Sequence, residues 1–347
     1  MPLQPISNPP NPWRTSEIEY LPEECDGAAP GAKLEVYQDH TREILATNDS
    51  PDLGFKWSVN PYRGCFHACA YCFARPTHEY LGLGAGTDFD RKITVKPDAP
   101  RLLREAFERK SWQGELVVFS GVTDCYQPLE ACYRLTRGCL EVCAEYRNPV
   151  GIITKAPLIE RDLDLLTALN QDARVSVTIS IPLWNRAHAH ALEPFVATPE
   201  RRMKTVERLA AAGLEVGVNV APLIPGLSEE DLGDLLTAAR DAGATRAGFV
   251  FLRLPGSVAK VFEERLRATL PLRADRVMNR VREARGGKLY DSRFGIRGRG
   301  TGQYAETAQT LFTSTAQRLG LQTGCMGGDD TTTFKRPIRA GMQLPLL

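Results

Sequence analysis

The chain has 347 residues, of which 43% are hydrophobic and 24% are charged, a balance typical of a globular protein and not of a disordered one. Its formal net charge of +1 excludes a whole-protein field that would recruit nucleic acid or a membrane surface. It has neither an apolar run of about 18 residues nor a basic-then-apolar start, so we expect a cytoplasmic protein with no membrane partner.

The first 54 residues differ in pattern from the rest of the chain. Prolines are frequent in residues 1–13, where neither helical nor strand periodicity is present. Short apolar runs at Leu34–Tyr37 and Glu43–Leu45 predict two strands. We therefore expect residues 1–54 to form an N-terminal extension that packs on the main domain.

Over residues 55–260, short apolar runs alternate with amphipathic segments. The predicted strands are Phe55–Asn60, Glu115–Gly121, Val150–Thr154, Arg174–Ile181, Leu214–Ala221 and Ala247–Leu252. The predicted helices include Ala99–Arg109, Leu129–Tyr146, Arg161–Leu169, Pro199–Ala212 and Glu229–Ala242, with Gly213 and Gly243 at the C-caps of the last two. Six such units predict an α/β core with a parallel sheet, either open and doubly wound or a partial barrel. In both architectures, ligands bind at the C-terminal ends of the strands.

Three closely spaced cysteines directly follow the first predicted strand. Cys65, Cys69 and Cys72 have the spacing C-x3-C-x2-C, and the odd total of nine cysteines favours metal ligation or catalysis over disulfides. Three thiolates at this spacing can hold one face of an iron–sulfur cluster, and a [4Fe–4S] cluster would keep one iron open to a further ligand. A zinc site would need a fourth ligand, which His67 or His78 could supply.

The string NPYRGCFHACAYCFAR, with Tyr71 just before the last cysteine, resembles the signature of the radical S-adenosylmethionine (radical SAM) superfamily. It is most similar to the spore photoproduct lyase-like, DNA repair photolyase-type branch. The resemblance covers about residues 55–300. The fold that it implies, a partial (β/α)6 TIM-type barrel, agrees with the six predicted units.

The resemblance implies a [4Fe–4S] cluster on Cys65, Cys69 and Cys72, whose open iron binds S-adenosylmethionine (AdoMet). In this superfamily an external flavodoxin- or ferredoxin-like reductant supplies the electron that cleaves AdoMet. The products are methionine and a 5′-deoxyadenosyl radical, which abstracts hydrogen from the substrate. The protein then has to orient the reactants and exclude water, as lyase-like members of the superfamily do.

The loop after the second strand is expected to contact the cofactor. By the same resemblance, Thr123 and Asp124 accept hydrogen bonds from the methionyl ammonium group; the alternative is a turn or a helix N-cap. Spore photoproduct lyase has a hydrogen-donating cysteine in this loop, before the Ser/Thr-Asp pair, whereas Cys125 follows the pair here. Cys125 is therefore either a hydrogen donor from a shifted position or a small residue in a tight loop.

The next three strand ends supply further candidates through the resemblance. Lys155 pairs with the methionyl carboxylate, or is a solvated lysine at a helix start. Ser180 binds a ribose hydroxyl, or is an ordinary strand serine. Glu193 and Arg202 match an E-P…R pattern of the family and predict a structural ion pair near the site. Ile224 is expected to form an apolar ledge for the adenine.

Residues 261–347 are predicted to form a helical, basic C-terminal region. Residues 260–300 contain 12 basic and 5 acidic residues, a local net charge of +7. Arg293, Arg297 and Arg299 are candidates for contacts with a nucleic-acid backbone. The alternatives are a phosphorylated small molecule or a solvated helix face. Cys325 is a surface thiol, a second hydrogen donor or an extra ligand.

The sequence therefore predicts a radical SAM enzyme, and nucleic acid is one candidate substrate. The alternative is a zinc-binding, non-catalytic nucleic-acid module. Cys132, Cys139 and Cys143 share one face of the predicted Leu129–Tyr146 helix, and we expect all three to pack in the core.

Overall fold

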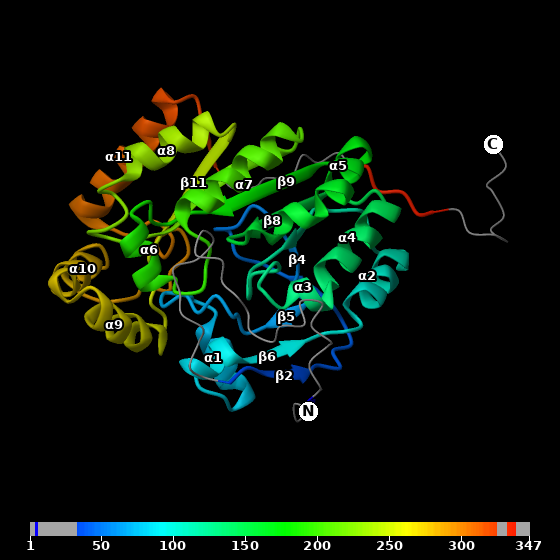
Figure 1. The fold of residues 1–347 in the computed structure, drawn as a ribbon, viewed down its shortest axis with the longest axis horizontal. Helices are drawn as coiled ribbons and strands as arrows, with labels where there is room; N and C mark the ends of the chain where they lie inside the picture. The colour runs from blue at the N-terminus through cyan, green and yellow to red at the C-terminus, as the bar shows by residue number, and fades with distance from the viewer. Residues whose placement is uncertain (1–3, 6–32, 325–331, 338–347) are drawn as a thin grey trace.

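The structure is a computed structural model that describes residues 4–5, 33–324 and 332–337. Its strands form two sheets (Figure 1). The main sheet has the strand order β12-β11-β10-β9-β8-β7-β4-β3, and a smaller sheet has the order β1-β2-β6-β5. Cys325 and most of the proline-rich start of the chain lie outside the described residues.

Six strands of the main sheet are parallel neighbours in chain order, which confirms the six predicted units. They are β4 (Trp57–Val59), β7 (Val117–Phe119), β8 (Val150–Thr154), β9 (Val175–Ser180), β10 (Glu215–Leu223) and β11 (Arg246–Phe251). At the edges, β3 (Leu45–Thr47) pairs antiparallel with β4, and β12 (Gln322–Thr323) pairs parallel with β11. Because β3 and β12 are unpaired with each other in the described chain, the sheet is an open, partial barrel.

Helices cover the outer face of this sheet. Val216, Val218 and Val220 of β10 belong to the buried core beneath them, so the alternate residues of β10 face the barrel interior. Gly213 and Gly243 follow two of the helices at φ values of +80° and +90°, which confirms the predicted caps. The helices with predicted counterparts are α2 (Ala99–Glu108), α3 (Glu130–Tyr133), α4 (Leu135–Glu145), α5 (Leu163–Asp172), α7 (Pro199–Ala211) and α8 (Leu232–Asp241).

The predicted helix Leu129–Tyr146 is wrong as a single helix. Arg134 has a left-handed backbone, with φ of +51°, and separates α3 from α4. The break lets the Glu130 carboxylate accept hydrogen bonds from the Thr136 and Arg137 N–H groups, at 2.9 and 3.2 Å, at the start of α4. It also separates Cys132, which is half-buried on α3, from the fully buried Cys139 and Cys143 on α4.

The smaller sheet lies beside the barrel (Figure 1). From its strand at Tyr62–Arg63 the chain runs into the loop that carries Cys65, Cys69 and Cys72, called the cluster loop below. In the smaller sheet β2 (Glu35–Gln38) pairs parallel with β6 (Lys92–Val95), and β1 (Gln4–Pro5) and β5 (Tyr62–Arg63) lie at the edges. The 3-10 helix η1 (Arg75–Leu81) and α1 (Thr87–Arg91) precede β6. The described part of the predicted N-terminal extension thus contributes strands to both sheets.

The C-terminal region is helical, as predicted. After β11 come α9 (Val258–Thr269), α10 (Pro271–Glu283) and α11 (Gly302–Arg318); α9 packs on α6 (Arg186–Leu192) and α10, and α11 packs on α8 (Figure 1). A second 3-10 helix, η2 (Pro157–Asp162), precedes α5. Within the described ranges, none of the helices is both long and apolar enough to cross a bilayer.

A buried lysine in the smaller sheet provides a test of its packing. Lys96, which follows β6, is 8% exposed, and burial together with Arg63 lowers its pKa to about 8. The unfolded chain therefore binds more protons between pH 8 and 10.5, and stability should rise with pH over this window. Lys96→Met should raise the free energy of unfolding at pH 7 by roughly 1–3 kcal/mol and remove this rise. Urea denaturation at pH 7 and pH 9.5 measures both effects; an unchanged pH dependence would contradict the assignment.

Candidate active site

The three predicted cluster cysteines lie on the loop after β4, at the C-terminal end of the first barrel strand. Cys65 and Cys69 are 7% and 8% exposed, and Cys72 is half-buried. Burial raises the pKa of all three thiols, that of Cys65 to about 12, so metal binding must displace their protons. Three buried thiols on one short loop are a donor set that fits an iron–sulfur cluster.

The loop takes a shape that particular residues make possible. Gly64 has a φ of +77°, and a Cβ there would stand 2.9 Å from the Phe89 carbonyl oxygen, so only glycine fits. The Phe89 carbonyl in turn accepts a hydrogen bond from the Cys65 N–H at 3.1 Å. The cluster loop is therefore packed directly against α1.

Arg75 anchors the cluster loop by binding one of its carbonyls. This residue was not among the site residues predicted from the sequence. Its guanidinium is 1% exposed and donates to the Cys69 carbonyl from Nε and Nη2, at 3.0 and 2.9 Å. It also forms an ion pair with Asp90 at 2.9 Å. The sequence signal for this role was its position three residues after Cys72. An arginine that is buried there needs several acceptors nearby, and the loop carbonyls supply them.

Gln127 and Thr123 hold the loop from the β7 side. The Gln127 side chain accepts from the Phe66 N–H at 3.0 Å and donates to the Gly64 carbonyl at 3.1 Å. The Thr123 hydroxyl donates to the same carbonyl at 2.7 Å. The fully buried Gln127 is thus a two-point clamp on the backbone that carries Cys65.

Removing this clamp should loosen the cluster loop. Gln127→Leu leaves a buried N–H without a partner and weakens the bonding of a carbonyl, so we expect a loss of about 1–3 kcal/mol of unfolding free energy. Iron should also be lost faster on exposure to air. Gln127→Glu keeps the acceptor for the Phe66 N–H, so its stability and its iron retention should lie between those of the wild type and of Gln127→Leu. Urea denaturation and iron content measure these effects, and wild-type behaviour of the leucine variant would refute the clamp.

Asp124 joins the ends of β7 and β8. Its Oδ1 accepts from the Thr154 hydroxyl at 2.6 Å, and its Oδ2 accepts from the Lys155 N–H at 2.7 Å. Its carboxylate also lies 3.5 Å from Nδ1 of His67 in the cluster loop. Asp124 thus ties β7 to β8, and Thr123 ties the same loop to the Gly64 carbonyl; their contact with a methionyl ammonium group stays a prediction.

Lys155 extends from the end of β8 toward the cluster loop. Its Nζ lies 5.9 Å from the centre of the Tyr71 ring. Burial by itself would lower its pKa, but the field of Cys69, Glu193 and Asp124 raises it above the ordinary value. The side chain therefore presents a positive charge beside Tyr71 and Cys69 of the cluster loop.

Glu193 and Arg202 form the predicted ion pair, at 2.7 Å with both side chains 1% exposed. The Tyr71 hydroxyl donates to Glu193, and Arg202 donates to the Ser180 carbonyl at 2.9 Å. The pair thus connects the cluster loop to the end of β9. The fully buried Ile224 belongs to the same apolar cluster as Cys69 and Tyr71.

Cys125 packs inside the protein, away from bulk solvent. The thiol is completely buried in the main core, with its sulfur 3.7 Å from the Phe119 carbonyl oxygen. Burial raises its pKa well above the ordinary value, so it remains a neutral thiol. The neutral S–H is also the form from which a hydrogen atom can be donated, and the donor role of Cys125 stays a prediction.

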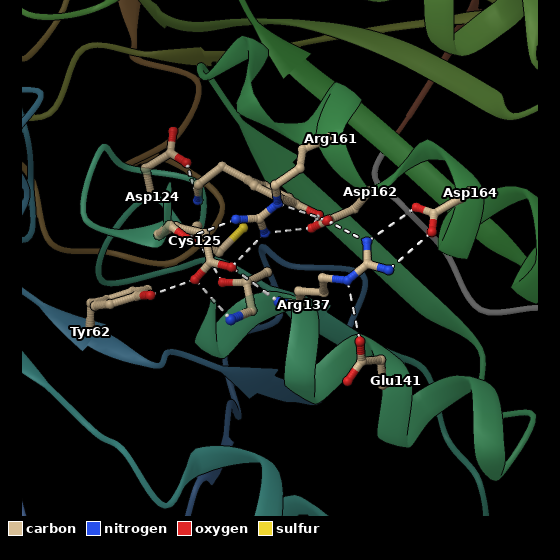
Figure 2. Close-up of polar contacts among 11 residues, drawn as sticks. Tyr62, Asp124, Cys125, Arg137, Glu141, Arg161, Asp162 and Asp164 are labelled. Carbon is tan, nitrogen blue, oxygen red and sulfur yellow. Dashed lines mark hydrogen bonds and ion pairs between the residues drawn. The ribbon is translucent and has the colours of Figure 1, made fainter. Parts of the chain in front are cut away.

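A network of buried charges packs against the loop that follows β7 (Figure 2). Glu130 and Asp162 are fully buried, and Arg161 donates to both carboxylates at 2.8 Å. Arg137 donates to Asp162 at 2.8 Å, and the Tyr62 hydroxyl donates to Glu130. Because Tyr62 lies three residues before Cys65, the network braces the base of the cluster loop.

In each of the two histidines considered as zinc ligands, the buried Nδ1 has no hydrogen-bond partner among the described residues. Nε2 of His78 is 2.9 Å from the Lys92 carbonyl oxygen, and His67 faces Asp124. Among the residues that the structure describes, no three His, Cys, Asp or Glu side chains are grouped to hold a single metal ion. This holds for Cys65, Cys69 and Cys72 as well, so metal analysis is the measurement that separates a zinc site from an iron–sulfur cluster.

The three arginines considered for nucleic-acid contacts are not equivalent. Arg293 is paired with Asp291 at 2.7 Å, and Arg297 with Asp52 at 2.5 Å. Arg299 is exposed, and its guanidinium has no partner among the described residues. Only Arg299 therefore offers an uncompensated charge.

A cavity of about 820 Å³ lies inside the barrel, on the side where the sheet is open. Its walls come from β9, β10 and β11, from residues 51–55 before β4, and from residues 294–299. Ile153 and Thr178 line it, each two residues before Lys155 and Ser180. Since alternate strand residues share a face, the cavity begins directly beneath the strand ends that carry these two candidates.

Comparison with known proteins places this geometry in context. A family model described as Radical SAM superfamily matches residues 59–239, which is just over half of the chain. A protein of Mycobacterium tuberculosis, described only as uncharacterized, is 41% identical over 207 residues, 59% of this chain and 61% of the relative. A radical SAM Nalpha-GlyT isomerase of Pseudomonas phage M6 is 23% identical over 233 residues, 66% of this chain and 46% of the relative. The chain thus spans less than two thirds of the length of either relative.

Solved structures of spore photoproduct lyase share the fold. A mutant with bound AdoMet and dinucleoside spore photoproduct has a TM-score of 0.61 at 16% identity, over 83% of this chain and 80% of that chain. The family match itself runs from the end of β4 into α8 and so includes the cluster loop and the strand ends around it. The chain belongs to the radical SAM superfamily.

Proposed function

We propose that the protein is a radical SAM enzyme in which Cys65, Cys69 and Cys72 hold a [4Fe–4S] cluster. The observation that carries this proposal is the buried cluster loop at the mouth of the barrel. The side chains of Gln127 and Arg75 hold this loop in place through hydrogen bonds to its backbone. When bound, the cluster supplies the electron that splits AdoMet into methionine and a 5′-deoxyadenosyl radical. A flavodoxin- or ferredoxin-like protein is the proposed external reductant.

The residues around the loop are suited to hold AdoMet. The positive charge of Lys155 beside the cysteines suits the methionyl carboxylate. Ser180 at the end of β9 and Ile224 near Tyr71 suit the ribose and the adenine. The barrel wall shields these residues from water, which strengthens each polar contact.

The substrate is proposed to occupy the cavity beneath these residues and to contain a nucleoside, free or within a nucleic acid. One structural neighbour supports this class by its title, since that spore photoproduct lyase mutant has bound dinucleoside spore photoproduct. The unpaired Arg299 at the cavity suits a phosphate group. The paired Arg293 and Arg297 contribute less to such binding.

Anaerobic reconstitution tests the cluster directly. Iron and acid-labile sulfide should each approach about four per chain, and AdoMet should bind the reconstituted protein with measurable affinity by calorimetry. One equivalent of zinc, with neither iron nor sulfide retained, would instead identify the non-catalytic zinc module.

A further inference from the structure

Two polar side chains on the cavity wall lack a hydrogen-bond partner among the described residues. Thr178 lies on β9 and Asn219 on β10; both are half-buried and line the cavity. Because both side chains line the cavity and are not bound by other described residues, their polar atoms are available to a ligand there.

Two glycines beside them keep these groups open to the cavity. A Cβ on Gly248 of β11 would stand 3.3 Å from Oδ1 of Asn219, and a Cβ on Gly217 would stand 3.5 Å from Oγ1 of Thr178. Glycine inside a strand lowers stability and often marks a close approach by a ligand. Both glycines line the cavity, so their missing side chains add to the space for a ligand.

The strand register places Asn219 next to the proposed cofactor residues. Asn219 is paired with Ser180 on β9 and with Gly248 on β11. A substrate held by Asn219 would therefore lie beside the residue proposed to bind the ribose of AdoMet.

Residues 294–299 contribute an aromatic and a charged residue to the cavity wall. Phe294 is 54% exposed and lines the cavity, together with the unpaired Arg299. Asp52, the acid on the same lining, is already bound by Arg297 and by the Gly295 N–H. This arrangement suits a flat ring with an attached anion.

We propose that Asn219 is the residue that determines base specificity in this cavity. Its amide presents a donor and an acceptor side by side, which can bind the polar edge of a nucleobase, and Thr178 supplies a further contact. Arg299 binds the phosphate of the same nucleotide unit. This inference rests on the proposed function, because it assigns the substrate site of that reaction.

Nucleotide binding tests the assignment without any turnover. The four deoxynucleoside 5′-monophosphates and their nucleosides are titrated into the cluster-loaded protein by calorimetry, with AdoMet present and no reductant. Asn219→Ala should weaken the preferred nucleotide by about 5–150-fold and leave AdoMet affinity unchanged. Thr178→Val, which keeps the shape of the side chain, should weaken it less. Asn219→Asp, an acceptor only, should shift preference toward bases with an exocyclic amino group.

Matched arginine variants test the charged end. Arg299→Ala should remove the advantage of monophosphates over nucleosides, whereas Arg293→Ala, an exposed arginine paired with Asp291, should not. Loss of AdoMet binding in Asn219→Ala would assign this residue to the cofactor and overturn the proposal. If no nucleotide binds while 5′-deoxyadenosine is still released, the base-reading site and the nucleoside substrate are wrong, and the proposed radical SAM cleavage of AdoMet stands. If nucleotide binding follows the predicted pattern but no AdoMet is cleaved, the site stands and the proposed function fails.

Discussion

Replacing Cys69 by alanine is expected to abolish cluster binding and, with it, all release of 5′-deoxyadenosine. With only two thiolates left on the loop, the cluster loses one of its three protein ligands. The barrel should remain folded, because alanine fills most of the space of a small thiol that is packed beside Tyr71. Iron content, 5′-deoxyadenosine and thermal melting are measured on the same preparation.

Cys132→Ala is the matched control for this experiment. Cys132 is a half-buried free cysteine on α3, outside the cluster loop. Its variant should retain iron and activity at the wild-type level. If Cys69→Ala retains a full cluster, or if both variants lose iron equally, the assignment of the loop as the cluster site is wrong.

Replacing Arg202 by methionine is expected to lower the free energy of unfolding by about 3–5 kcal/mol. The change leaves Glu193 as a buried charge in an apolar environment, with Tyr71 as its remaining partner. Because Tyr71 belongs to the cluster loop, AdoMet affinity should fall as well. Urea denaturation and AdoMet titration measure the two effects.

Two further variants distinguish loss of the ion pair from general damage to α7. The double variant Arg202→Met, Glu193→Leu removes both charges and should regain part of the lost stability. Arg208→Ala removes an exposed arginine on the same helix and should cost less than about 1 kcal/mol. A double variant that is less stable than Arg202→Met alone would contradict a buried, uncompensated Glu193 as the cause.

The barrel could be predicted because its strands are short apolar runs buried on the sheet, each followed by an amphipathic helix. Val150–Thr154 was predicted to the residue. The break at Arg134 could not be predicted from the apolar periodicity, which continues through it. The break depends on the Glu130 side chain, whose carboxylate binds the N–H groups at the start of α4. The segment between Cys72 and β6 was missed for a similar reason: η1 and α1 are short and are held by tertiary contacts of Arg75.

The site was predictable where chemistry requires a local spacing, as for Cys65, Cys69 and Cys72. Residues that act through tertiary contacts were not found, and Gln127 is the clearest case, since its partners lie 61 and 63 residues away in the sequence. Gly217 and Gly248 did carry a signal, because an isolated glycine inside a strand pattern marks a close approach. That signal becomes interpretable only when the register shows which side chains the glycines leave open.

The fate of AdoMet on the reconstituted, dithionite-reduced protein tests the radical SAM assignment most directly. We expect 5′-deoxyadenosine and methionine to be released in equal amounts, only in the presence of the reductant, and Cys69→Ala to release neither. A folded protein with a full complement of iron and sulfide that leaves AdoMet intact under these conditions would show the assignment to be wrong.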